Sequence, residues 1–94
     1  MKIEFTGEHK WNIDGWTSFR AIVDGKQVTN RIAMESLQDY FGSDGSRDGD
    51  EAAYQQHRAS IDKIAEKMIR DGEINKYGGA DLTTDAIERS GHRL

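Results

Sequence analysis

The chain has 94 residues, of which 35% are hydrophobic and 32% are charged, so it holds enough apolar material for one core. We expect a single α+β domain spanning residues 1–94, and we exclude a chain that is disordered throughout. The absence of cysteine excludes disulfides, thiolate nucleophiles and zinc–thiolate or iron–sulfur centres. A formal net charge of −4 argues against a protein that tracks phosphate backbones. No apolar run approaches the ~20 residues of a membrane helix and no secretory signal begins the chain, which together predict a cytoplasmic protein.

Three segments near the start of the chain predict β-strands. Charged and apolar side chains alternate over residues 2–5, which is the period of a half-buried strand. Two longer strand-like runs, 17–23 and 26–32, are joined by Asp24-Gly25. This dipeptide tolerates the positive φ values of a type I′ turn, so the two runs predict a β-hairpin.

A two-residue turn also fixes the register of the predicted hairpin. It pairs Phe19 with Asn30 and Ala21 with Val28 on a mostly apolar face, which we expect to pack on the core. The opposite face is mostly polar and should meet water; it consists of Ser18, Arg20, Ile22, Gln27, Thr29 and Arg31.

Helical periodicity follows the hairpin. Apolar residues four apart over 33–41, with Gly42 in the place of a C-cap, predict a short helix. Residues 50–71 predict one long helix, and Asp48 with Glu51 resembles a capping box at its start. Its apolar stripe, which the hairpin should cover, consists of Ala53, His57, Ile61, Ile64, Ala65 and Met68.

The last part of the chain has a weaker pattern. Residues 73–82 fit either a small hairpin or one short strand after a loop. Thr83 or Thr84 caps a last short helix, and residues 90–94 should fray. The predicted fold is therefore α+β, with a small antiparallel sheet that contains a β-hairpin, packed against one long helix and one or two short helices.

The segment FRAIVDGKQVTNRIAMESLQDYFG, residues 19–42, with the long helix and the threonine-acid motif after it, resembles a family of short bacterial proteins. That family is catalogued as domain of unknown function 1488. The resemblance implies a small α+β fold in which a hairpin-containing sheet packs on helices, and it brings no assigned reaction. The chain departs from the expected pattern in the loop 42–49, which is rich in glycine and acid, and at Ala33, where a capping serine or threonine is more usual.

One loop has the beginning of a calcium-binding pattern. Asp44, Ser46 and Asp48 alternate and Gly49 follows, as in the opening of a calcium loop. The twelfth position, which should supply a bidentate glutamate, is Gln55. The loop 44–55 therefore predicts at best a weak calcium site, and the competing interpretation is a solvated loop that caps a helix.

No catalytic residue and no cofactor are predicted. The histidines are far apart in the chain and lack metal-ligand spacing; we expect His57 to pack on the apolar helix face, and His9 and His92 to face solvent. No serine lies in a nucleophile motif, and no glycine-rich loop carries the lysine of a phosphate site. The acids Asp50 and Glu51 are explained by stabilisation of the helix dipole.

The predicted outer face of the hairpin offers one candidate binding patch. If the strand reaches Trp16, its ring lies on the polar face with Arg20 and near Arg31, a combination enriched at binding hot spots. In the alternative interpretation Trp11 and Trp16 both cover an edge of the core. We favour a noncatalytic accessory or protein-interaction module. The alternatives are a nucleic-acid-associated regulator that uses Arg20 and Arg31, weak calcium binding, and an enzyme assembled at an oligomer interface; the sequence gives neither the partner nor the oligomeric state.

Overall fold

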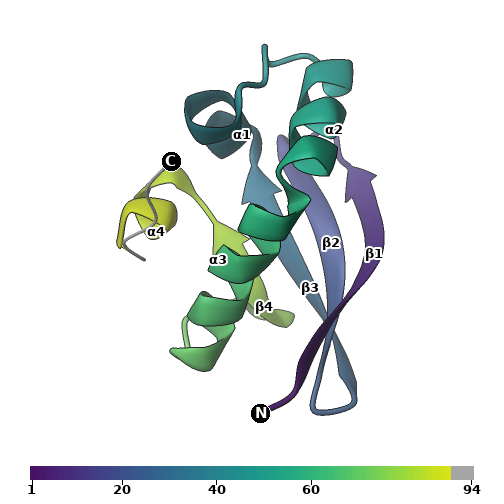
Figure 1. Cartoon of the computed structure of the whole chain (residues 1–94), viewed down its shortest axis with the longest axis vertical. Coiled ribbons are helices and arrows are strands. Elements are labelled where there is room, and N and C mark those ends of the chain that lie inside the picture. The colour runs from purple at the N-terminus through teal and green to yellow at the C-terminus, as the bar shows by residue number, and fades with distance from the viewer. Residues whose placement is uncertain (90–94) are drawn as a thin grey trace.

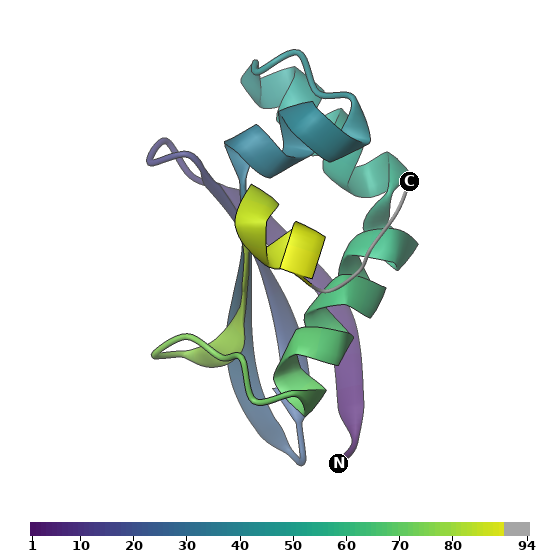
Figure 2. The same ribbon diagram turned by 90° about the vertical axis from the view of Figure 1, so that its left-hand side faces the viewer.

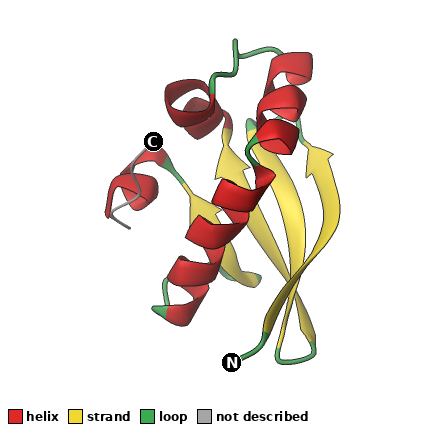
Figure 3. Cartoon of the chain, viewed as in Figure 1, coloured by secondary structure: helices red, strands yellow, loops and turns green. Residues whose placement is uncertain are grey.

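The computed structural model describes residues 1–89, in which a four-stranded sheet carries four helices on one of its sides (Figures 1, 2 and 3). The predicted α+β fold is confirmed. In chain order the elements are β1 (Ile3–Trp11), β2 (Trp16–Val23), β3 (Lys26–Ala33), α1 (Met34–Phe41), α2 (Arg47–Gln56), α3 (Arg58–Arg70), β4 (Gly78–Leu82) and α4 (Thr84–Arg89). We call the helix-covered side of the sheet the inner face and the other side the outer face. The predicted fraying of residues 90–94 lies outside the described residues.

The hairpin of β2 and β3 has the predicted register. Asp24 and Gly25 have φ values of 50° and 84°, as a type I′ turn requires. Phe19 pairs with Asn30 and Ala21 with Val28, and Phe19 and Ala21 are buried on the inner face. The division of the hairpin into a core side and a water side is therefore confirmed.

Strand β1 is longer than the predicted 2–5 and pairs antiparallel with β2 up to Trp11. Between Phe5 and His9 the register shifts, and Gly7 has a φ of +87°. Residues 6–8 stand opposite Arg20 alone, so the bulge adds an even number of residues, and the odd-numbered side chains of β1 stay on the inner side. Gly7 and His9 occupy inner positions without being apolar, which is why the pattern of residues 2–5 underestimates the strand.

The predicted long helix is two helices, α2 and α3, separated by a bend at His57 (φ −108°, ψ 17°). The N–H of His57 still donates to the carbonyl of Ala53 and the N–H of Ile61 to that of His57, both at 3.0 Å, so the apolar spacing continues across the bend. Periodicity alone therefore does not detect it. The helix also starts earlier than predicted, because Ser46, and not Asp48, accepts the cap hydrogen bond from the N–H of Gly49 at 2.9 Å.

Strand β4 resolves the two alternatives for residues 73–82 in favour of one short strand after a loop. It pairs parallel with β3, so the sheet is mixed, because α1, α2 and α3 form the crossover between these strands. The strands approach so closely that a Cβ on Gly79 would collide with the backbone carbonyl of Thr29. Thr83 caps α4 by accepting from the N–H of Ala86 at 3.1 Å.

Asn30 is a fully buried polar residue in the middle of the core face. Its Nδ2 donates to the carbonyl of Phe19 at 3.2 Å, and its Oδ1 accepts from the N–H of Ala80 at 2.8 Å. One side chain thus joins β2 to β4 across β3. The apolar side chains around it form a core that includes Phe19, Ile32, Leu37, Tyr54, Ile61, Ile64, Leu82 and Ile87.

We predict that Asn30→Ala lowers the free energy of unfolding by about 2–4 kcal/mol, because two buried backbone groups lose their partners. Chemical denaturation monitored by circular dichroism measures this loss. The matched control is Gln27→Ala, an exposed polar residue of the same strand, which should change the stability by at most about 0.5 kcal/mol. Equal effects of the two substitutions would contradict the bridging role of Asn30.

Candidate functional site

None of the helices of residues 1–89 lies over the outer face of the sheet (Figure 2). The strand residues directed to this face are mainly polar. The type I′ turn fixes which side chains point there, because the parity that buries Phe19 exposes Arg20. On β3 the same parity places Arg31 opposite Ser18 and Thr29 opposite Arg20. The binding patch predicted from the sequence, Trp16, Arg20 and Arg31, lies on this face.

Trp16 and Arg31 lie together on the outer face. The guanidinium carbon of Arg31 is 4.2 Å from the centre of the Trp16 ring, which is a cation–π contact. The same guanidinium donates from Nε and Nη2 to the two carboxylate oxygens of Asp81 at 2.9 and 2.7 Å. The centre of the Tyr77 ring lies 5.9 Å from the same guanidinium carbon. We call Trp16, Arg31, Tyr77 and Asp81 the aromatic–arginine cluster.

The ion pair at the centre of this cluster is partly shielded, with 28% of the Arg31 side chain and 29% of the Asp81 side chain exposed. Burial acts to raise the pKa of Asp81, but hydrogen bonds from Arg31 and Asn75 outweigh it and hold that pKa below its ordinary value. The hydrogen bond to Asp81 raises the pKa of Arg31. The Nδ2 of Asn75 reaches Asp81 at 2.7 Å, so the carboxylate is fixed from two sides. Arg31 is therefore held in one orientation.

Arg20, the third residue of the predicted patch, is on the same face but does not join this cluster. Its Nη1 donates to Glu8 of β1 at 2.7 Å. The sequence did not predict Tyr77 and Asp81 at this site. Both lie in residues 73–82, for which the sequence left two strand arrangements open. Only the parallel pairing of β3 with β4, which places Asp81 opposite Arg31, brings them to the site.

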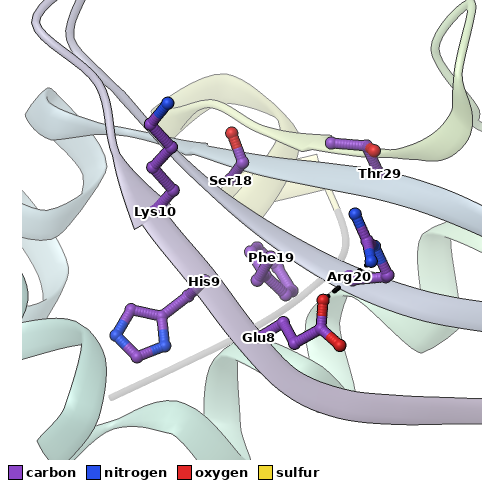
Figure 4. Close-up of a pocket in the computed structure, with 7 residues that line it drawn as sticks. All are labelled: Glu8, His9, Lys10, Ser18, Phe19, Arg20 and Thr29. Atoms are coloured by element: carbon purple, nitrogen blue, oxygen red, sulfur yellow. Dashed lines mark hydrogen bonds and ion pairs between the residues drawn. The ribbon is translucent and has the colours of Figure 1, made fainter.

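A shallow cleft of about 300 Å³ lies beside the cluster on the same face (Figure 4). Figure 4 shows Lys10, Ser18 and Thr29 directed to one side of the strands, while His9 is directed to the other. The cleft follows the strands β1, β2 and β3 at the position of the β1 bulge. Its lining residues are Glu8, His9, Lys10, Ser18, Phe19, Arg20 and Thr29.

The two tryptophans have different environments, so the alternative in which both cover a core edge does not hold. Trp11 lies on the helix side, where its Nε1 donates to Asp50 at 3.1 Å. Asp50 is fully buried and also accepts from the hydroxyl of Ser43 at 2.5 Å. This carboxylate therefore ties β1 and the loop before α2 to the helix, a role beyond the dipole stabilisation expected from the sequence.

Two of the three histidines, His9 and His57, pack against aromatic rings. His9 was expected in solvent, but its ring packs on Tyr54 at 4.8 Å between centres and its Nε2 lies 3.0 Å from the amide nitrogen of Gln55. The reason is that β1 extends to Trp11 and keeps its odd-numbered residues on the inner side, so His9 faces the helices as Phe5 does. His57 packs against the ring of Phe41 at 5.2 Å, as expected. His92 lies outside the described residues.

Two of the three candidate calcium ligands, Asp44 and Ser46, are used in local hydrogen bonds. Asp44 accepts from the N–H and the hydroxyl of Ser46, and the hydrogen bonds from Ser46 lower its pKa. Ser46 caps α2, and Asp48 lies exposed in the first turn. Within residues 1–89 no group of three or more histidine, aspartate or glutamate side chains is arranged to hold a metal ion.

Asp62 of α3 is a titratable group on the helix side of the molecule. Burial raises its pKa to about 6 against the opposing charge of Arg58. Its Oδ1 is buried and has no hydrogen-bond partner within the described part of the chain. Burial together with the charge of Asp62 raises the pKa of Tyr54. The ionised form of Asp62 is therefore unfavourable in the folded state.

We predict a pH-dependent effect of Asp62→Asn on stability. A carboxyl group whose pKa is higher in the folded state stabilises the fold below pH 4, and this contribution is lost as the pH rises through 6. Asp62→Asn should therefore stabilise the protein at pH 8 by about 1 kcal/mol, a value reduced by partial solvation, and change little at pH 4. Denaturation curves at the two pH values measure the difference, and a gain of equal size at both would contradict the assignment.

The fold and the face define a small α+β protein whose mixed sheet is covered by helices on one side and presents polar and aromatic side chains on the other. A family model described as protein of unknown function, DUF1488, matches residues 3–80, and the chain belongs to this family. This confirms the resemblance seen in the sequence.

The structure is similar to the crystal structure of a protein of unknown function from the DUF1488 family of Shewanella loihica PV-4. The TM-score is 0.77 at 21% identity, over 87% of this chain and 94% of that chain, which shows a shared fold. A search of curated proteins finds no match. Across residues 1–89, no helix combines the length and the apolar character needed to cross a membrane.

Proposed function

We propose that the protein is a noncatalytic interaction module of the bacterial cytosol that binds a protein partner through the outer face of its sheet. The observation that carries the proposal is the aromatic–arginine cluster, in which Arg31 is stacked on Trp16 and paired through two hydrogen bonds with Asp81. Tryptophan, tyrosine and arginine are the residue types that dominate binding energy at protein interfaces.

The cluster is organised before a partner arrives. Arg31 is already fixed by Asp81 and Trp16, so binding costs little of its side-chain entropy. Tyr77 has 49% of its surface exposed and supplies apolar area next to the fixed charge. A guanidinium fixed close to two rings, on a face that no helix of residues 1–89 covers, is suited to a partner's backbone carbonyls and apolar side chains.

The other functions are supported less well. Nucleic-acid binding needs several cations that are free to meet phosphates, whereas Arg31 is held by Asp81 and the chain carries a net charge of −4. An enzyme assembled at an oligomer interface would draw on a perturbed acid such as Asp62, which belongs to the helix side and not to the outer face. Calcium binding would have to compete with the helix cap for Asp44 and Ser46.

We predict that Trp16→Ala combined with Tyr77→Ala abolishes binding of the partner, because it removes both rings that flank Arg31. Affinity capture with quantitative mass spectrometry should show proteins enriched by the wild type and at least about ten-fold depleted with the double variant, as expected for the loss of two hot-spot side chains. The control is Lys63→Ala, an exposed residue of α3 on the helix side, which should capture the same proteins as the wild type.

Circular dichroism spectra establish that the double variant is folded. Retention of every captured protein by the folded double variant would refute the proposal. Captured material that is removed by nuclease treatment, with binding that weakens steeply with salt, would refute it in favour of the nucleic-acid alternative.

A further inference from the structure

The cleft beside the aromatic–arginine cluster is formed at an irregularity of β1. Phe5 pairs with Ala21 and His9 with Phe19, so three residues of β1 stand opposite Arg20 alone. The left-handed conformation of Gly7 makes this bulge possible, and the guanidinium of Arg58 lies against Gly7 from the helix side. The bulge places Glu8 beside Arg20 at the edge of the cleft.

The cleft presents hydrogen-bond donors that are not in use. Within residues 1–89, the ammonium group of Lys10 and the hydroxyl of Thr29 have no hydrogen-bond or ion-pair partner. The hydroxyl of Ser18 accepts from the amide of Asn12 at 2.9 Å, so its own proton remains available to donate. Arg20 uses Nη1 for Glu8, and its other side-chain N–H groups have no partner among the described residues. The carboxylate in the lining of the cleft is that of Glu8, which Arg20 holds.

The charge of the cleft is opposite to that of the whole chain. Lys10 and Arg20 outnumber Glu8, which leaves one positive charge in a protein of net charge −4. The Glu8 carboxylate, 2.7 Å from Arg20, shows which anion fits this position. The pair is solvent-exposed, with 43% of the Arg20 side chain and 64% of the Glu8 side chain accessible, and exposed pairs of this kind are weak enough to exchange.

We propose that the cleft binds a carboxylate side chain from an acidic segment of the partner protein, and that this carboxylate displaces Glu8 from Arg20. A single excess positive charge matches a carboxylate better than a doubly charged phosphate. The position is also adjacent to the aromatic–arginine cluster, because Ser18 of the cleft pairs with Arg31 of the cluster. The inference thus rests on the proposed function and adds the chemistry of the partner: apolar groups at Trp16 and Tyr77, and an acid at Lys10 and Arg20.

A titration of the isotope-labelled protein with a hexaglutamate peptide at low salt, followed by nuclear magnetic resonance, tests the inference. We expect shifts of the backbone amides of residues 8–10, 18–20 and 29, and no shifts with hexaglutamine. Lys10→Gln combined with Arg20→Gln should remove these shifts. Glu8→Gln frees Arg20 and should raise the affinity for hexaglutamate about two- to five-fold, the range expected for one exposed charge pair.

Binding of hexaglutamine as tight as that of hexaglutamate, or unchanged affinity in Glu8→Gln, would overturn the inference. Inorganic phosphate that shifts the same amides at equal or lower concentration would overturn it in favour of a general anion site.

The failure of this inference can be distinguished from the failure of the proposed function. Captured proteins that depend on Trp16 and Tyr77 without any hexaglutamate binding leave the interaction face standing and refute the acidic segment. Peptide binding at Lys10 and Arg20 with capture independent of Trp16 and Tyr77 refutes the cluster and leaves the cleft standing.

Discussion

The antiparallel register of β2 and β3 determines which side chains the protein buries and which it displays. Phe19 and Ala21 pack beneath the helices because the two-residue turn at Asp24-Gly25 fixes their pairing, and the same pairing directs Arg20 and Arg31 outward. A slip of one residue would exchange the two sets and place charges in the core. The core and the candidate binding face therefore depend on one constraint.

The second constraint is the attachment of β4. The buried amide of Asn30 holds the N–H of Ala80 while it also bonds the carbonyl of Phe19, and the lack of a side chain at Gly79 lets the strands approach. The parallel pairing that results sets Asp81 against Arg31. A core interaction thus fixes the orientation of the guanidinium on the outer face, which joins the stability of the sheet to the organisation of the site.

The parts of this fold that rest on local patterns were predictable. The Asp24-Gly25 turn, the burial of Phe19, the helix that ends before Gly42 and the proximity of Trp16 to Arg31 follow from residues close in the chain or joined by a tight turn. Features that rest on distant contacts were not. Asp81 reaches Arg31 across fifty positions, the bulge at Gly7 sets three residues of β1 opposite Arg20, and the bend at His57 leaves the apolar spacing of α2 and α3 intact.

The two sides of the sheet have different roles: the helix side forms the core, and the outer face carries the candidate binding residues. Asp50, Tyr54 and Asp62 belong to the packing of the helices on the sheet. Trp16 and Arg31 are covered by none of the helices of residues 1–89, and Arg31 is held by its contacts with Trp16 and Asp81. Side chains fixed in this way at a surface reduce the entropic cost of association.

Hydrogen–deuterium exchange of the protein with and without its captured partner tests this division most directly. The account predicts that the partner slows exchange in residues 16–20, 28–31 and 77–81 and leaves α2 and α3 unchanged. Protection confined to α2 and α3, with the outer face exchanging as in the free protein, would contradict it.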